Sequence, residues 1–379
     1  MTPPIPAALL CVLLGAATTA QASSCWVYFG TSSTNIRKGI YRAELNQETG
    51  ALTHLDRVAQ KSNSVFLALA PDHRHLYALA EVRPAGAPHP VEAVETYAVD
   101  AKTGKLEAVG EQVTDGSEAC HLSIDPSGRC LLAANYDGAC VEVFPILPDA
   151  TVGPRTAQVH FKGSGPNPSR QRSAHPHSIN VDPSGRFAVV ADLGQDRVFV
   201  YKFDAAKGTL EPNDPAFATV PPGSGPRHFA FHPDGVHAFV INELTGTITA
   251  FTWDASKGVL TPYDTTSILP KDFVGTNTSA EVVVSASGKF VYGSNRGDDS
   301  LVVSAFDSAT GKLTQVQRIT DGVKVPRNYA IDPSGRWLVC GNLTANNATV
   351  YRIDPDAGTL SLVGRVAVPE PLCVRFLQR

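Results

Sequence analysis

A short hairpin-like segment recurs along the chain, and this repeat limits the possible folds more than any other feature of the sequence. Each copy has two apolar stretches joined by a turn such as Pro-Ser-Gly or Pro-Asp-Gly. In these turns proline presets φ, aspartate or serine can bond the backbone, and glycine accepts a positive φ. In chain order the copies are LALAPDHRHLYALAE (67–81), LSIDPSGRCLLAANY (122–136), INVDPSGRFAVVADL (179–193), AFHPDGVHAFVINE (230–243), VVVSASGKFVYGSNR (282–296) and AIDPSGRWLVCGNL (330–343).

The spacing of the turns predicts the architecture. Corresponding turn positions are 47 to 57 residues apart. After the hairpin comes a third apolar stretch, then a turn of the type Asp-x-x-x-Gly-x-Leu and a fourth stretch, as in 197–215. Repeats of this length with four antiparallel strands are typical of β-propeller blades.

Six hairpins are complete, and the two ends of the chain supply a seventh. The segment WVYFGTSS (26–33) resembles the second strand of a hairpin, and PLCVRF (371–376) resembles a first strand. Pairing them in one blade would close the ring and remove open sheet edges. We therefore predict an all-β protein with a single domain over residues 23–379. That domain is a seven-bladed β-propeller with four antiparallel strands per blade.

Residues 1–22 read as a signal peptide. An apolar run over 5–17 precedes Ala20-Gln21-Ala22, a small-residue pattern that fits cleavage after Ala22. The run is too short for a stable transmembrane helix. We expect an exported protein, periplasmic or secreted, with no stable membrane span after cleavage; a membrane-tethered protein is the alternative.

Composition excludes one class of partner. The net charge is −4 and no basic block occurs, whereas nucleic-acid binding needs a clustered basic surface. Beyond residue 22 the chain has six widely scattered cysteines, which favours buried thiols over a disulfide framework. No histidine–cysteine cluster has zinc-site spacing. We expect a monomer that uses no metal or other cofactor.

The candidate site follows from strand direction. The first strand of each hairpin starts, and the second ends, at the face of the ring opposite the Pro-Ser-Gly turns. Charged residues at these ends occur in only some blades, so they do not serve the repeated scaffold. They comprise His121, His177, Arg227, His228 and Arg327 at strand starts, and Glu81, Glu243 and Arg296 at strand ends. This mixture around one concave mouth predicts a small-molecule site.

A loop adds basic residues to the same mouth. The segment GSGPNPSRQRSAHPH (163–177) carries Arg170, Arg172 and His175, and its glycine, proline and serine content predicts a long loop. These groups favour an anionic or polyhydroxylated ligand. The structural alternatives are an ion pair that plugs the channel, interior hydrogen-bonded histidines and a merely solvated loop.

The sequence resembles the lactonase propeller family, which includes bacterial 6-phosphogluconolactonase and fungal carboxymuconate lactonising enzymes. The resemblance rests on VYFGTSS…GIY, PSGRCLLAANY, RQ…HPHS, PRHFAFHPDG…INE, SNRGDDS and PRNYAIDPSGRWL. It implies His177, Arg227, Glu243 and Arg296 as catalytic residues and no metal requirement. One departure is that the usual Pro-His-Ala-His order reads Ala-His-Pro-His here.

Lactone hydrolysis suits these residue types. Glu243 or His177 could accept a proton from water, and arginines could stabilise an oxyanion. No GxSxG motif is present, so an acyl-serine route is not expected. Export favours an unphosphorylated lactone such as gluconolactone as the substrate. The alternatives are a muconate-type cycloisomerase, a non-enzymatic ligand-binding propeller and a calcium-dependent gluconolactonase-like propeller.

Overall fold

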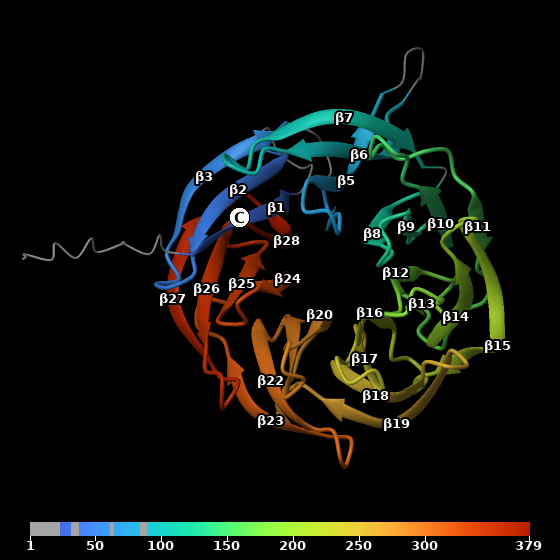
Figure 1. Cartoon of the computed structure of the whole chain (residues 1–379). Coiled ribbons are helices and arrows are strands. Elements are labelled where there is room, and N and C mark those ends of the chain that lie inside the picture. The colour runs from blue at the N-terminus through green and yellow to red at the C-terminus, as the bar shows by residue number, and fades with distance from the viewer. Residues whose placement is uncertain (1–22, 32–37, 61–63, 84–88, 115) are drawn as a thin grey trace, which may run out of the picture.

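The computed structural model describes residues 23–31, 38–60, 64–83, 89–114 and 116–379, whose strands form a closed ring around a central channel (Figure 1). The predicted signal peptide lies outside these residues. Within the described ranges the secondary structure is β-strand and turn, without a helix. In that part of the chain no helix is long and apolar enough to cross a membrane.

Seven sheets of four antiparallel strands make up the ring, as the repeat predicts. Going from the channel outward, the first three blades are β28 (Pro371–Gln378), β1 (Ser24–Thr31), β2 (Ile40–Asn46), β3 (Leu52–Ala59); β4 (Leu67–Leu69), β5 (His75–Val82), β6 (Val91–Val99), β7 (Leu106–Val113); and β8 (Ala119–Ile124), β9 (Cys130–Asn135), β10 (Cys140–Pro145), β11 (Ala157–His160). The next two are β12 (Pro176–Val181), β13 (Phe187–Asp192), β14 (Arg197–Asp204), β15 (Thr209–Thr219); and β16 (Pro226–Phe231), β17 (His237–Asn242), β18 (Thr247–Asp254), β19 (Val259–Ser267). The last two are β20 (Thr278–Val284), β21 (Phe290–Arg296), β22 (Ser300–Asp307), β23 (Lys312–Ile319); and β24 (Pro326–Ile331), β25 (Trp337–Asn342), β26 (Asn347–Ile353), β27 (Leu360–Ala367).

The ends of the chain share one blade, as predicted. Strand β28 pairs antiparallel with β1, in a register that runs from Cys25 opposite Gln378 to Thr31 opposite Pro371. In Figure 1 the blue start and the red end of the chain lie side by side in this blade. No sheet edge is therefore left open at the junction of the ring.

The hairpin turns are fixed by side-chain capping. In the β12–β13 turn, Asp182 Oδ1 accepts hydrogen bonds from the backbone N–H groups of Arg186 and Phe187 at 2.8 and 2.7 Å. Gly185 has a φ of 72°, which an L-side chain rarely adopts. Asp125 and Asp332 cap their turns in the same way. The repeated Asp-Pro-Ser-Gly sequence is thus a scaffold element.

Apolar side chains from adjacent blades form the core. One cluster joins Phe187 and Val200 of one blade to Phe229 and Trp253 of the next, all nearly inaccessible to solvent. Burying such side chains contributes roughly 1.5–3 kcal/mol each. The six cysteines after residue 22 are free thiols and all but Cys120 are buried, which confirms the prediction made for them.

A β-bulge recurs near the start of the innermost strands and sets the direction of the channel side chains. The register of β12 against β13 shifts between Pro176 and Ser178, and the same shift occurs in β8, β16 and β24. Bulges re-aim side chains and are common beside active sites. The bulge residues, here called the upper tier, are Cys120, His177, Arg227 and Arg327. The lower tier, one step further along the inner strands, comprises His121, His228, Glu281 and Asn328.

Candidate functional site

A cavity of about 430 Å³, the upper cavity, opens at the end of the channel away from the hairpin turns. This volume falls within the range of small-molecule sites, roughly 300–1,000 Å³. Its lining includes Tyr136, Arg170, His177, Glu243, Arg296 and Arg327. Five of these six were predicted to belong to the site from the sequence, and the structure brings those five together.

Glu243 is the centre of the polar network in this cavity. It directly follows β17, is 4% exposed, and accepts hydrogen bonds from three guanidinium groups. Arg170 Nη2 lies 2.6 Å from its Oε1, while Arg227 Nε and Arg296 Nη2 lie 2.9 Å from its Oε2. Burial alone would raise the pKa of Glu243, but the charges of Arg296, Arg227 and Arg170 lower it to about 2. The carboxylate is therefore ionised at neutral pH and a weak base.

Arg327 differs from the other cavity arginines because no carboxylate of the described residues is bound to it, although the charges of Glu243 and Glu118 act on it from a distance. Within the described ranges its guanidinium makes no hydrogen bond or ion pair, although it is only partly exposed. Burial and the nearby charge of Arg227 lower the pKa of Arg327 to about 10, so it remains a cation at neutral pH. Its donors remain open to a ligand in the upper cavity.

His177 supplies a neutral imidazole in the same cavity. It is 5% exposed, and burial together with the charge of Arg227 holds its pKa well below the usual 6.5. Its Nδ1 lies 3.7 Å from the Sγ of Cys120. In the part of the chain that the structure describes, its Nε2 makes no hydrogen bond. The ring is consequently available as a proton acceptor above pH 6.5.

Six residues predicted for the site lie outside the lining of the upper cavity: Arg227, which reaches it only through Glu243, the pair His121 and His228, and His175, Arg172 and Glu81. His175 supports it from behind: its ring stacks on Tyr136 with centroids 4.2 Å apart, and its Nδ1 lies 3.0 Å from the Tyr136 carbonyl oxygen. Arg172 points to solvent, and its Nε donates to the Pro168 carbonyl oxygen at 2.6 Å. Glu81 lies in β5, away from the lining.

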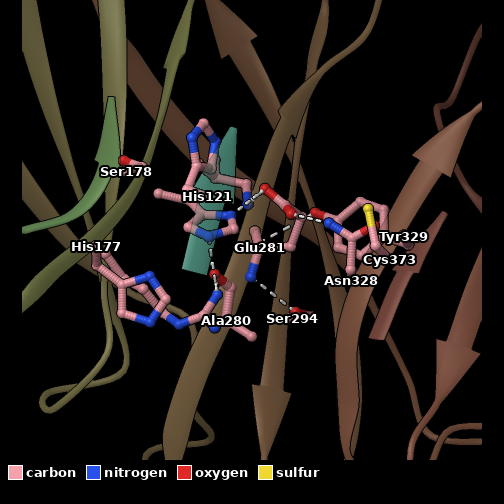
Figure 2. A network of polar contacts seen from close by, with 12 residues as sticks. His121, His177, Ser178, Ala280, Glu281, Ser294, Asn328, Tyr329 and Cys373 are labelled. Atoms are coloured by element: carbon pink, nitrogen blue, oxygen red, sulfur yellow. Dashed lines mark hydrogen bonds and ion pairs between the residues drawn. The ribbon is translucent and has the colours of Figure 1, made fainter. Parts of the chain in front are cut away.

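His121 and His228 line a different cavity, which corrects their predicted place at the mouth. This lower cavity has a volume of about 440 Å³ and also contacts Glu281 and Arg375. His228 Nδ1 lies 2.9 Å from Glu281 Oε1, and Asn328 Nδ2 donates to Glu281 Oε2. Figure 2 shows Glu281 and Asn328 meeting across two neighbouring blades, near His121. Because both histidines follow a bulge residue, they lie one step deeper in the channel.

A constriction separates the two cavities. The space between them is only about 10 Å³ and is lined by Arg227, His228, Arg327 and Asn328, among others. Such a volume holds a single water at most. Arg227 Nη1 approaches His228 Nε2 at 3.3 Å across this level and also donates to the Ala280 carbonyl oxygen at 2.7 Å. A ligand in the upper cavity therefore does not reach the lower one.

Six lining residues were not predicted for the site, and three of them carry polar or titratable groups next to its charges: Tyr136, Cys120 and Glu118. Tyr136 donates no bond to Glu243 but accepts one from Arg170 Nη2 at 3.2 Å, which holds that arginine in place. Cys120 is the bulge residue of β8, and Glu118 precedes the same strand. Burial and Asp137 raise the pKa of Glu118. Tyr136 occupies the same strand-end position as Glu243 and Arg296, and it was not predicted because only charged residues at these ends were taken as candidates.

Fold and site together define a closed seven-bladed propeller with a cationic small-molecule cavity at one mouth of its channel. The family described as "Lactonase, 7-bladed beta-propeller" matches residues 26–376. The chain belongs to this family, which confirms the resemblance found in the sequence.

Named relatives cover nearly the whole chain. The 6-phosphogluconolactonase of Bacillus subtilis is 32% identical over 353 residues, covering 93% of this chain and 98% of the relative. That of Serratia proteamaculans is 32% identical over 333 residues, covering 88% and 94%. The structure of Pseudomonas aeruginosa periplasmic gluconolactonase matches with a TM-score of 0.86 and 32% identity, covering 94% and 99%. These relatives are lactone hydrolases by name.

Proposed function

We propose that the protein hydrolyses a sugar lactone in the upper cavity. The observation that carries this proposal is the presence in one cavity of a neutral imidazole, His177, and of a guanidinium, Arg327, that no carboxylate of the described residues hydrogen-bonds. Lactone hydrolysis needs a proton acceptor for water and a cation for the carbonyl oxygen. The names of the relatives support the same reaction.

In the proposed mechanism, His177 Nε2 accepts a proton from a water molecule as the water oxygen attacks the lactone carbonyl carbon. Arg327 donates hydrogen bonds to the carbonyl oxygen as it becomes an oxyanion. The bond between that carbon and the ring oxygen then breaks, and the ring oxygen takes the proton back from His177. General-base help contributes roughly 10²–10⁴-fold in rate, and each oxyanion donor ~10²–10³-fold.

Glu243 acts on the arginines rather than on the substrate in this scheme. Its carboxylate orients Arg170, Arg227 and Arg296 and offsets their mutual repulsion. The pKa of about 2 makes it a poor proton acceptor at neutral pH. Arg296 completes the site because it lines the cavity and its Nε and Nη2 are held by the carbonyl oxygens of Thr278 and Ser279.

An unphosphorylated lactone such as gluconolactone fits the charges of the cavity. A phosphate dianion is usually bound by several charge-assisted donors. Here Arg170 and Arg296 are engaged by Glu243, and the basic side chain of Arg172 lies outside the lining. The proposal includes a signal peptide over residues 1–22, cleavage before Ser23 and export of a monomeric propeller domain, 23–379. The periplasmic relative from Pseudomonas aeruginosa supports export.

The test is proton release at constant pH from glucono-1,5-lactone and 6-phosphogluconolactone, with spontaneous hydrolysis subtracted. The chain from Ser23 should accelerate hydrolysis of gluconolactone, and Arg327→Ala should lower kcat/KM by ~10²–10³-fold. Arg375→Ala is the matched control, because this guanidinium lines the lower cavity. No acceleration on either lactone would overturn the proposed activity. Acceleration on 6-phosphogluconolactone alone would overturn only the unphosphorylated substrate.

A further inference from the structure

The turn between β16 and β17 has metal-binding side chains at three positions that carry other residues in most of the hairpin turns. It reads HPDGVH (232–237), whereas three of the other repeats read Asp-Pro-Ser-Gly at the corresponding place. The position of His232 is Asp, Ser or Ala elsewhere, that of Asp234 is usually Ser, and that of His237 is usually an aromatic residue or Cys. All three replacements are side chains that bind divalent metals. This turn lies at the face of the ring opposite the upper cavity.

The three side chains converge in space. Their potential ligand atoms all lie within 4.8 Å of one another. His232 Nδ1 is 2.9 Å from Asp234 Oδ1, and His237 Nδ1 is 2.7 Å from Asp234 Oδ2. Zinc binds imidazole nitrogen and carboxylate oxygen at ~2.0–2.2 Å, which places neighbouring tetrahedral ligands roughly 3–3.5 Å apart. The two histidine–aspartate distances are therefore only a few tenths of an ångström below those expected around such an ion.

The hydrogen bonds of His232 fix its tautomer and place the unprotonated nitrogen beside the Asp234 carboxylate, where a bound cation would replace the backbone N–H of Asp234 as its partner. Its Nε2 lies 2.8 Å from the carbonyl oxygen of Gly288, which can only accept, so Nε2 carries the proton. Its Nδ1 accepts from the backbone N–H of Asp234 at 3.2 Å and is thus unprotonated. That nitrogen then faces the Asp234 carboxylate, another acceptor, in a contact that a cation would make favourable. A histidine with one nitrogen on a backbone carbonyl is the usual arrangement of a metal ligand.

The surroundings suit a bound cation. His232 is 5% exposed, and the ring of Phe306 packs against both histidines with centroid distances of 5.0 and 5.1 Å. Within the described part of the chain, the ion-pair partners of Asp234 are these two histidines, with no lysine or arginine among them. The side chain of Asp234 is 28% exposed, so a fourth coordination position is open to water.

The first repeat provides an internal comparison. There Asp72 and His75 form the same contact, with His75 Nδ1 2.7 Å from Asp72 Oδ2. The position of His232 is Ala70 in that repeat, so a third ligand is missing. The aspartate–histidine contact alone is therefore a turn feature, and His232 is what makes the cluster capable of chelation.

We propose that His232, Asp234 and His237 bind one Zn²⁺ ion, with water in the fourth position. The site is separate from the upper cavity and takes no part in the proposed hydrolysis. Three nitrogen and oxygen ligands around an open position are a common zinc arrangement. No metal was expected from the sequence, because the chain has no histidine–cysteine cluster with zinc-site spacing and because the family resemblance implies no metal requirement.

Equilibrium dialysis of the full chain from Ser23, without a histidine tag, against micromolar ZnCl₂ tests the proposal. One zinc per chain is expected. His232→Ser, Asp234→Ser and His237→Phe each install a residue that other repeats carry at that position, so folding should be preserved. Each should weaken zinc binding by ~100-fold or more, since even the partners behind metal ligands contribute ~10–100-fold.

Asp72→Ser combined with His75→Phe is the matched control and should leave zinc binding unchanged. Replacing zinc by Co²⁺ gives a second readout, because a four-coordinate site shows visible absorption bands that His232→Ser should abolish. Absence of zinc binding to the unchanged chain would overturn the proposal and leave a hydrogen-bonded turn. Equal binding by all three variants would overturn it as well, since the zinc would then lie elsewhere.

Discussion

The upper and lower cavities of the channel are nearly equal in volume, about 430 and 440 Å³, and successive residues such as Cys120 and His121 contribute to one and to the other. Their charges nevertheless differ. In the lower cavity the carboxylate of Glu281 is satisfied by His228 and Asn328. In the upper cavity three arginines share Glu243, whereas Arg327 makes no hydrogen bond or ion pair with any residue that the structure describes. The two cavities therefore differ in which charged groups are still able to bind a ligand, and not in size.

The largest expected contrast is between a histidine of each tier. His177→Gln should lower kcat by ~10²–10⁴-fold, because it removes the proposed proton acceptor. His121→Gln should change kcat little, since the constriction separates His121 from the upper cavity. Steady-state rates on gluconolactone measure both. Similar losses in the two variants would show that the tiers do not act separately.

The two central carboxylates should separate activity from stability. Glu243→Gln should reduce stability by about 3–5 kcal/mol, because it leaves buried guanidinium groups without a counter-charge. It should also lower kcat/KM by up to ~10²-fold through misplaced arginines. Glu281→Gln should cost about 1–3 kcal/mol, since His228 can stay neutral, and should leave kcat/KM unchanged. Urea unfolding and steady-state rates give both quantities. A large activity loss in Glu281→Gln would contradict this division.

The pH dependence should report the state of His177. Burial, followed by the charge of Arg227, holds its pKa well below 6.5. Protonation would inactivate the imidazole as a base, so a lowered pKa moves the loss of activity to more acid pH. We expect kcat/KM to stay constant from pH 7.5 to 6.5 and to fall only below that range. Colorimetric measurement of the remaining lactone is suitable there. A midpoint of this fall at pH 7 or above would contradict the role of His177 as the proton acceptor. The same fall in kcat/KM at acid pH should be seen in His121→Gln.

The smallest effect on kcat/KM is expected from a substitution at the contact between the upper tier and the lower tier. His228 Nε2 lies 3.3 Å from Arg227 Nη1, so His228→Phe should remove one hydrogen bond from that arginine. A loss of ~2–10-fold in kcat/KM corresponds to the net value of one such bond. Arg227→Lys keeps a charge but cannot keep all three contacts of the guanidinium, with Glu243, His228 and the Ala280 carbonyl oxygen, so it should cost more. An effect of His228→Phe as large as that of His177→Gln would mean that the tiers form one site.

The fold was predictable because the turns repeat, whereas the site was only partly so. The spacing of the Asp-Pro-Ser-Gly turns and the match between 26–33 and 371–376 were sufficient for the closed ring. The repeat also placed Glu243 and Arg296 correctly at strand ends. It could not show that His177, the bulge residue of β12, points into the upper cavity. Nor could it show that His228, which follows the bulge residue of β16, lines the lower one. Bulges change the alternation of side chains without a sequence signature.

The charges that surround Glu243 were the second feature that could not be predicted from the sequence. Glu243 was considered as a proton acceptor, but three guanidinium groups converge on it from separate strands and loops. Long-range convergence of this kind depends on the completed ring. The HPDGVH turn is local, yet its three potential ligands meet only because the hairpin folds the chain back and Gly288 of the neighbouring blade fixes His232.

Because the first and the last strand pair in one blade, the two ends of the described domain could be joined without changing the order of the strands around the ring. Arg379 Nη1 donates to the hydroxyl of Ser24 at 2.9 Å, so the two ends of the described domain are neighbours. A short linker between them, with a new opening in an outer loop of another blade, should leave every sheet intact. The same junction joins residues more than 300 positions apart, and closing so long a segment is entropically costly. We therefore expect ring closure to follow the folding of the individual blades, once the last strand is available.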